Sequence, residues 1–65
     1  MKILVNGAWR ETGARELAAA LHELGYAGAV VSTAVNGEFV AAGERGERLL
    51  AEGDRLEVVA PMQGG

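Results

Sequence analysis

The chain has 65 residues, of which 49% are hydrophobic, with a formal charge of −3 and no cysteine. A chain of this length forms one domain at most, and it buries only about 60% of the surface that it exposes when unfolded. Without cysteine it is not a disulfide scaffold and has no thiol nucleophile, and its single histidine is not enough to build a metal site. The acidic charge and the lack of a Lys/Arg cluster argue against binding to nucleic acid or to an anionic membrane.

The N-terminal residues and the apolar runs indicate where the protein works. The segment 1–5 is mostly apolar, but the chain turns polar at Asn6, which is too early for a signal peptide. No segment approaches the roughly 20 apolar residues that a membrane-spanning helix needs. We therefore expect a cytoplasmic protein, stabilised by a compact aliphatic core.

A β-hairpin is the first predicted element. Residues 2–6 are rich in aliphatic side chains, and Asn6-Gly7 is the strongest local signal for a type I′ turn, which needs positive φ at both central residues. Residues 8–11 form the second strand, which is polar enough for the edge of a sheet. We expect Trp9, in this strand, to cover one end of the core.

An amphipathic helix follows the hairpin. Thr12 is the predicted N-cap, and Gly25 the residue that ends the helix, with Tyr26 placed for the hydrophobic contact that accompanies such ends. His22 falls on the polar side of the helix and is expected to be solvated. The apolar side is formed by residues at helical spacing, namely Ala14, Leu17, Ala18, Leu21 and Leu24.

A second hairpin is predicted after the helix. Residues 29–35 form the longest strand pattern in the chain, and a second Asn-Gly pair, Asn36-Gly37, joins it to a strand at 38–41. We expect Val31, Thr33 and Val35 to point into the core, which directs Ala34 outward.

A polar connection, residues 42–53, leads to the last strand. We expect Leu49 and Leu50 to attach this connection to the core through one helical turn. The last strand is predicted at 55–60, and Pro61 ends it because proline has no N–H group for a sheet ladder.

These elements predict an α+β fold, in which a five-stranded mixed sheet packs on one α-helix. The last strand runs parallel to the first and lies between the first and third strands, because a right-handed crossover through the helix places the second hairpin beside it. The predicted domain covers residues 1–60. Residues 61–65 form a flexible C-terminal tail that ends in Gly64-Gly65.

Four blocks of the sequence carry a resemblance to a known family: 3–7 (Ile-Leu-Val-Asn-Gly), 17–25, 34–40 and 52–59. The most specific part is a Glu-Gly-Asp turn at 52–54, followed by one apolar strand and a short tail ending in Gly-Gly. In these features the chain resembles the ThiS family, the β-grasp, ubiquitin-like sulfur carriers of thiamin biosynthesis. The similarity covers essentially the whole chain.

The resemblance implies a carrier and not an enzyme. In that family a ThiF-like enzyme uses ATP and Mg²⁺ to adenylate the C-terminal glycine carboxylate. The carboxylate then becomes a thiocarboxylate with sulfur from a donor protein, and thiazole synthase receives the sulfur. The resemblance assigns the reactive carboxylate to Gly65, and Gly64 is the slim residue that lets it enter the enzyme. The carrier itself is expected to bind no cofactor, and Gly43 and Gly46 lack the sequence of a phosphate-binding loop.

The alternation of the strands predicts a surface for these partners. If Leu56, Val58 and Ala60 face the helix, Val59 faces outward beside Leu4. Exposed apolar patches on small proteins usually mark contacts, although these residues could also be exposed singly without a role. The candidate partner-binding residues are Leu4, Ala34, Phe39, Val59 and Met62.

Three other functions fit the same sequence features. The small subunit of molybdopterin synthase is also a β-grasp sulfur carrier that ends in Gly-Gly, but it is usually longer. A ubiquitin-like modifier would join its terminal glycine to lysines of target proteins. A β-grasp interaction module would have a tail without a chemical role.

Overall fold

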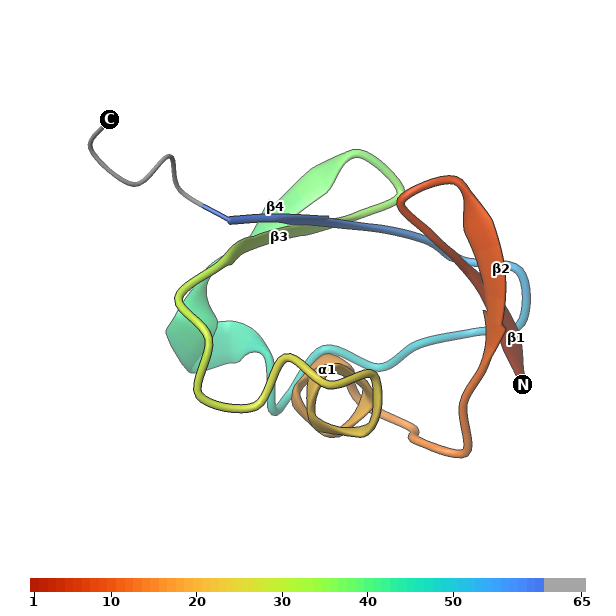
Figure 1. Ribbon diagram of the computed structural model, residues 1–65, viewed down its shortest axis with the longest axis horizontal. Helices are drawn as coiled ribbons and strands as arrows, with labels where there is room; N and C mark the ends of the chain where they lie inside the picture. Colours follow the sequence, from red (N-terminus) through yellow and green to blue (C-terminus); the bar gives the residue numbers. More distant parts are fainter. Residues whose placement is uncertain (61–65) are drawn as a thin grey trace.

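The computed structural model describes residues 1–60, which form two layers (Figure 1). The elements are β1 (Lys2–Val5), β2 (Ala8–Glu11), α1 (Leu17–Glu23), β3 (Ser32–Val35), β4 (Glu38–Val40), the 3₁₀ turn η1 (Ala42–Glu44) and β5 (Arg55–Val59). The sheet curves over α1, and its strand order is β2-β1-β5-β3-β4. β1 and β5 are parallel, whereas the other neighbours are antiparallel. The predicted β-grasp fold, with the last strand between the first and third, is confirmed.

Both predicted Asn-Gly turns are present. The φ angles are +50° at Asn6 and +85° at Gly7, and +52° at Asn36 and +83° at Gly37. Positive φ at both central residues is the geometry of a type I′ turn, whose twist matches that of the strands that it joins. The two hairpins therefore follow from local sequence.

The helix is shorter than predicted, and Thr12 is not its N-cap. α1 begins at Leu17, five residues after Thr12. The Thr12 hydroxyl instead accepts a hydrogen bond from the Ala14 N–H (3.0 Å) and donates one to the Glu23 carboxylate. Thr12 thus stabilises a local turn and ties it to the far end of α1.

The connection between η1 and β5 explains why the helix begins late. The N–H groups at a helix start have no partner within the helix and need one elsewhere. Here the Leu17 N–H donates to the Arg48 carbonyl (2.8 Å), and the Ala18 N–H donates to the Arg45 carbonyl (3.0 Å). A segment distant in sequence therefore caps α1.

The buried face of α1 also differs from the predicted face. Leu17, Ala20 and Leu21 are buried, while Ala18 is exposed. With Leu17 as the first helical residue, positions i+3 and i+4 share its face and position i+1 does not. The prediction that Ala18 faces the core is therefore wrong.

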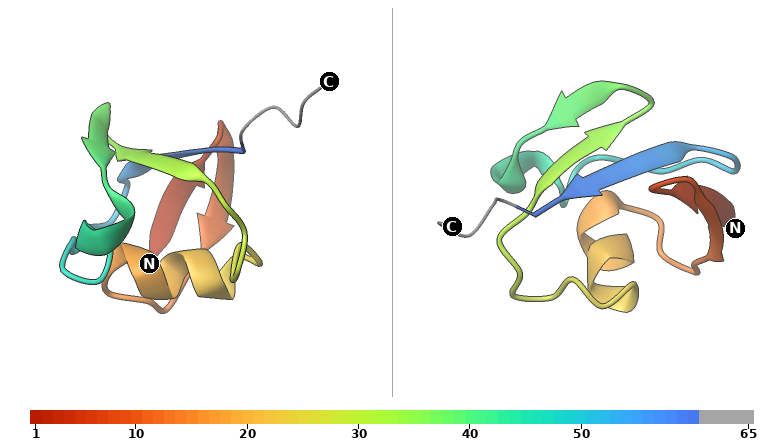
Figure 2. Two further views of the ribbon diagram at one scale, coloured as in Figure 1. Left: turned by 90° about the vertical axis from the view of Figure 1, so that its left-hand side faces the viewer. Right: turned by 45° about the horizontal axis from the view of Figure 1, so that its top comes forward.

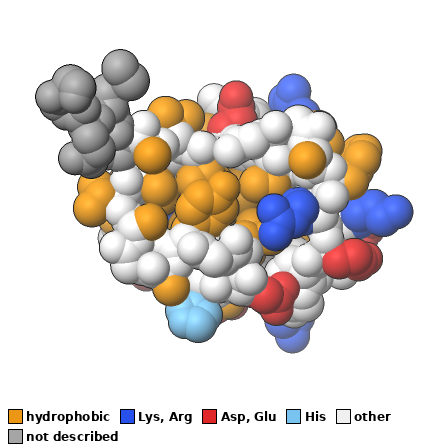
Figure 3. Space-filling model, in the orientation of Figure 1, with side chains coloured by type: hydrophobic (Ala, Val, Ile, Leu, Met, Phe, Trp, Pro, Cys, Tyr) orange, Lys and Arg blue, Asp and Glu red, His pale blue; other side chains and the backbone are white. Residues whose placement is uncertain are grey.

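The predicted end of the helix is confirmed. Gly25 has a φ of +97°, the Tyr26 N–H donates to the Leu21 carbonyl (2.8 Å), and the Gly25 N–H donates to the His22 carbonyl (3.2 Å). These two bonds define a Schellman motif. Tyr26 packs against the core, and His22 is exposed, as expected (Figure 3).

β3 begins at Ser32 and not at residue 29, and Arg45 binds the chain on both sides of this start. The Arg45 guanidinium donates to the Val31 carbonyl (2.6 Å) and to the Thr33 hydroxyl (3.0 Å). Val30 is largely exposed. Hydrogen bonds from the Arg45 side chain therefore fix the chain at the start of β3.

Four predictions in the second half of the chain are wrong. β4 stops at Val40, and β5 stops at Val59, so Ala60 is exposed outside the strand. The helical turn of the connection is η1 and does not include Leu49. Leu50 is buried but Leu49 is 71% exposed, so only Leu50 attaches this connection to the core.

The core lies between α1 and one face of the sheet. Its buried members are Ile3, Val5, Leu17, Ala20, Leu21, Val35, Val40, Leu50, Leu56 and Val58. Burial of this aliphatic surface is the main stabilising contribution, at about 25 cal/mol per Å². Figure 3 shows hydrophobic side chains still visible between the two layers on one side of the molecule.

Trp9 does not cover the core, contrary to the prediction. It is 58% exposed and lies on the other face of the sheet, opposite Leu4 in the β1–β2 ladder. Within residues 1–60 no helix is long and apolar enough to cross a membrane.

Candidate partner-binding face

The sheet has a second face, which points away from α1 (Figure 2). We call it the open face. Side chains alternate along each strand, and paired residues on neighbouring strands share a face. On β5 the buried Leu56 and Val58 therefore alternate with exposed residues on the open face. The open face carries Leu4, Trp9, Ser32, Ala34, Phe39, Arg55, Glu57 and Val59.

Three of the predicted partner-binding residues lie together on the open face. Ala34 pairs with Phe39 across β3 and β4, and Val59 pairs with Ser32 in the next ladder. Phe39 is 67% exposed and Val59 is 61% exposed. With Ser32, Thr33 and Glu57, these residues line a depression of about 170 Å³. We call Ala34, Phe39 and Val59 the Phe39 patch.

Leu4 does not belong to the Phe39 patch. It pairs with Arg55, which lies four residues before Val59 on the same strand. At about 3.3 Å per residue, that separation is roughly 13 Å. The prediction that Val59 lies beside Leu4 is wrong, because β1 ends at Val5 and the chain turns away. Met62, the fifth predicted residue, lies outside the described residues, as do Gly64 and Gly65.

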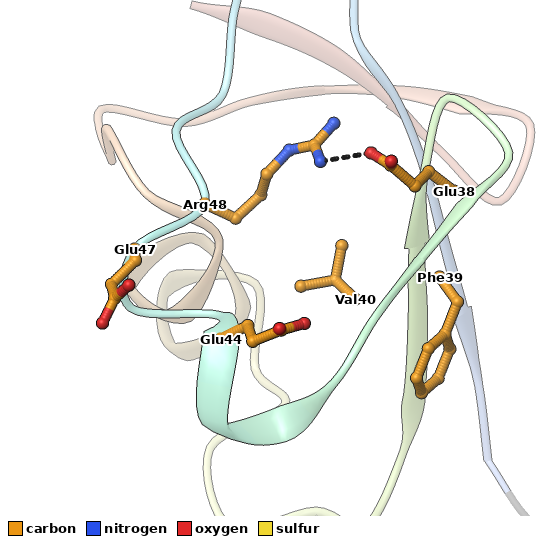
Figure 4. A pocket seen from close by; sticks show the side chains of 6 residues that line it. All are labelled: Glu38, Phe39, Val40, Glu44, Glu47 and Arg48. Carbon is orange, nitrogen blue, oxygen red and sulfur yellow. Dashed lines mark hydrogen bonds and ion pairs between the residues drawn. The ribbon is translucent and has the colours of Figure 1, made fainter.

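Carboxylates lie on both sides of β4, and Glu57 lines the depression of the Phe39 patch itself. Behind β4 lies a depression of about 280 Å³, in which Arg48 forms an ion pair with Glu38 at 2.6 Å (Figure 4). Glu44 and Glu47 also line this depression, and Figure 4 shows the Phe39 ring on the other side of the strand from Val40. On the open face, Phe39 and Val59 lie beside Glu57, which suits a partner that has an apolar pocket with a basic residue next to it.

The shifted pKa among the described residues belongs to the helix layer and not to the open face. The Glu23 carboxylate accepts hydrogen bonds from the Thr12 hydroxyl and from the Gly13 N–H (3.0 Å). Both bonds stabilise the ionised carboxylate and lower its pKa, and the bond from Thr12 has the larger effect. Residues 1–60 contain no group of three or more His, Asp or Glu side chains placed to bind a metal ion.

Comparison with known proteins gives a match along nearly the whole chain. The model of the ThiS family matches residues 3–65. The chain belongs to the ThiS family. Its fold is similar to that of the crystal structure of the thiamine biosynthesis protein (ThiS) from Geobacter metallireducens, with a TM-score of 0.83 and 29% identity over the full length of both chains. No protein of curated function matches it. Membership of the ThiS family supports a role as a sulfur carrier in thiamin biosynthesis and not as an enzyme.

In this ThiS-family protein, two asparagine side chains hold the strand that leads to the C-terminal tail. The Asn36 Nδ2 donates to Asp54 (3.0 Å), and the Arg55 N–H donates to Asn36 Oδ1 (2.9 Å). Asn6 makes a similar pair of bonds with Val58, near the other end of β5. Sequence reasoning assigned both asparagines to turns and missed these bonds. A signal was available, because each turn ends a strand that neighbours β5.

Proposed function

We propose that this chain carries sulfur on the carboxylate of Gly65 for the synthesis of the thiazole ring of thiamin. A ThiF-like enzyme adenylates the carboxylate with ATP and Mg²⁺, and the resulting thiocarboxylate gives its sulfur to thiazole synthase. The family match, which extends through residue 65, is the observation that carries this proposal. The cytoplasm is the proposed location.

The chemistry of the carboxylate supports this order of steps. A carboxylate is a poor acyl electrophile, because its negative charge opposes attack by a nucleophile. Attack of a carboxylate oxygen on the α-phosphorus of ATP releases pyrophosphate and forms an acyl-adenylate, from which AMP leaves readily. Sulfide displaces AMP and gives the thiocarboxylate directly. A persulfide of the donor protein displaces AMP to form an acyl disulfide, and a thiol then attacks its outer sulfur, so that the thiocarboxylate leaves and a disulfide is formed. The carrier needs no cysteine for these steps, and it has none.

The proposed role of Gly64 is steric. A residue without a Cβ atom passes through a narrower channel than any other residue and adopts a wider range of φ and ψ. Replacement of Gly64 by a bulky residue should therefore block entry of Gly65 into the activating enzyme, without a change in the fold of residues 1–60.

The Phe39 patch is the proposed docking surface for the activating enzyme. It lies at the end of β5 from which the chain continues to residue 61, so a partner bound there is close to the tail. Glu57, which lines the depression of the patch, favours a partner with a basic residue beside an apolar pocket. Leu4, with Trp9, occupies a separate part of the open face.

Transfer to two acceptor enzymes tests the pathway. The purified chain is converted to the thiocarboxylate and then incubated with thiazole synthase or with the large subunit of molybdopterin synthase. The proposal predicts loss of sulfur to thiazole synthase alone. Transfer only to the molybdopterin enzyme would assign the chain to the other pathway.

A further inference from the structure

β1 stops pairing with β5 before β5 ends. The Leu4 N–H donates to the Asp54 carbonyl (2.9 Å), and the Asn6 N–H donates to the Leu56 carbonyl (2.9 Å). Alternate residues of a strand direct their main-chain groups to the same neighbour, so Val58 is the next residue of β5 that faces β1. There the first chain has already entered its turn, with positive φ at Asn6.

The side chain of Asn6 takes the place of the missing strand. The Val58 N–H donates to Asn6 Oδ1 (2.8 Å), and Asn6 Nδ2 donates to the Val58 carbonyl (3.0 Å). A carboxamide has one acceptor oxygen and an N–H donor, as a peptide group has. The Asn6 carboxamide therefore makes two hydrogen bonds like those of a longer β1. These bonds hold β5 at Val58, two residues beyond the last main-chain bond to β1 at Leu56.

This support lies close to the point where the tail begins. Val58 precedes Val59, which belongs to the Phe39 patch, and Ala60, the last described residue. On the other side of β5, Val59 pairs with Ser32 of β3. The end of β5 is thus held from both sides, by a strand on one and by a single side chain on the other.

We propose that Asn6 is a positioning residue for the C-terminal carboxylate, an inference that rests on the proposed function. Asn6 fixes the direction in which the chain leaves β5. The five residues after Ala60 span at most roughly 17 Å, so the place where the chain leaves β5 limits the region that the carboxylate can reach. Adenylation requires this carboxylate at the α-phosphorus of ATP, and small misplacements of reacting groups slow such reactions strongly.

Asn36 provides a matched control within the same chain. It occupies the same turn position as Asn6, with a φ of +52°, and a glycine follows it in both cases. Its side chain also makes two hydrogen bonds, but to Asp54 and Arg55 at the start of β5. Glycine at either position keeps the turn and removes both side-chain bonds. Asn6→Gly and Asn36→Gly therefore differ in which end of β5 they release.

The test compares the two variants as substrates of the ThiF-like enzyme. Pyrophosphate release is measured with ATP over a range of carrier concentrations, at a temperature where circular dichroism shows both variants folded. Asn6→Gly should lower kcat about tenfold and change KM less than about twofold, because docking is retained and positioning is lost. Asn36→Gly should leave both constants within about twofold of the wild-type values.

Amide order parameters of Val59 and Ala60 in the free protein give a second measurement that does not depend on any enzyme. Asn6→Gly should lower them, and Asn36→Gly should not.

Equal kinetic effects of the two variants, or a rise in KM alone, would overturn the role of Asn6. If the wild-type chain is not adenylated at all, the proposed function fails, and the order parameters still decide whether Asn6 fixes the end of β5. If Asn6→Gly does not fold, Asn6→Asp replaces it, since aspartate keeps the acceptor and loses the donor.

Discussion

Truncation of Phe39 should weaken binding to the activating enzyme much more than it lowers the free energy of unfolding. The ring is 67% exposed, so only about a third of it contributes to folding. Full burial of a phenylalanine is worth about 1.5–3 kcal/mol, and Phe39→Ala should therefore lower the free energy of unfolding by only about 0.5–1 kcal/mol.

The same truncation should weaken binding to the activating enzyme strongly. A phenylalanine side chain has roughly 200 Å² of surface, of which about 130 Å² is exposed here and available to a partner. At about 25 cal/mol per Å² that area corresponds to at most about 3 kcal/mol. Alanine retains the Cβ atom, so we expect a loss of about 2 kcal/mol, or about a 30-fold rise in KM for adenylation. The assay is pyrophosphate release at varied carrier concentration.

Trp9→Ala is the matched control for this prediction. Trp9 is 58% exposed on the same face of the sheet, but it lies in β2, at the opposite edge from β4. Its truncation should leave KM unchanged. An unchanged KM for Phe39→Ala, or equal increases for the two variants, would refute the assignment of docking to the Phe39 patch.

Three further predictions concern the tail and the helix. Deletion of Gly65 should abolish adenylation and leave the thermal unfolding midpoint nearly unchanged; a large fall in the midpoint would mean that the tail contributes to folding. Gly25→Ala should destabilise the fold by about 1–2 kcal/mol in urea denaturation, because the φ of +97° strains a residue with a Cβ atom. Crowding does not add to this cost, since beyond Gly25 and its two chain neighbours no atom of the described residues lies within 4 Å of the added carbon. The lowered pKa of Glu23 stabilises the fold above the usual value of 4.5, and this contribution is lost as the pH falls through the folded-state pKa. The stability advantage of wild type over Glu23→Ala should therefore be constant near neutral pH and shrink below pH 4.5, and an advantage independent of pH would contradict the shift.

The sequence predicts the fold well where the signals are local. Each Asn-Gly turn needs only two residues to define it, and the Schellman motif at Gly25 needs a helix and one glycine. The alternation of β5 places Leu56 and Val58 inside and Val59 outside, as observed. Together these signals predict the order of the elements, from which the β-grasp topology follows.

The errors arise where distant segments decide the local structure. The start of α1 depends on carbonyl groups of Arg45 and Arg48, which no pattern around Thr12 reveals. The register of β1 against β5 places Leu4 beside Arg55, and a parallel register is not encoded by the alternation of either strand alone. As a result the sequence predicts that Ala34 and Val59 face outward from their strands, but it does not predict which of the outward residues meet.

Intact mass spectrometry tests the central claim most directly. The chain is co-expressed with its ThiF-like enzyme and a sulfur donor protein, purified and compared with the chain expressed alone. A sulfur carrier should gain the mass that corresponds to replacement of one oxygen by sulfur, and fragmentation should place this change at Gly65. An unchanged mass, or a bond from Gly65 to a lysine of another protein, would contradict the proposal that this chain carries sulfur.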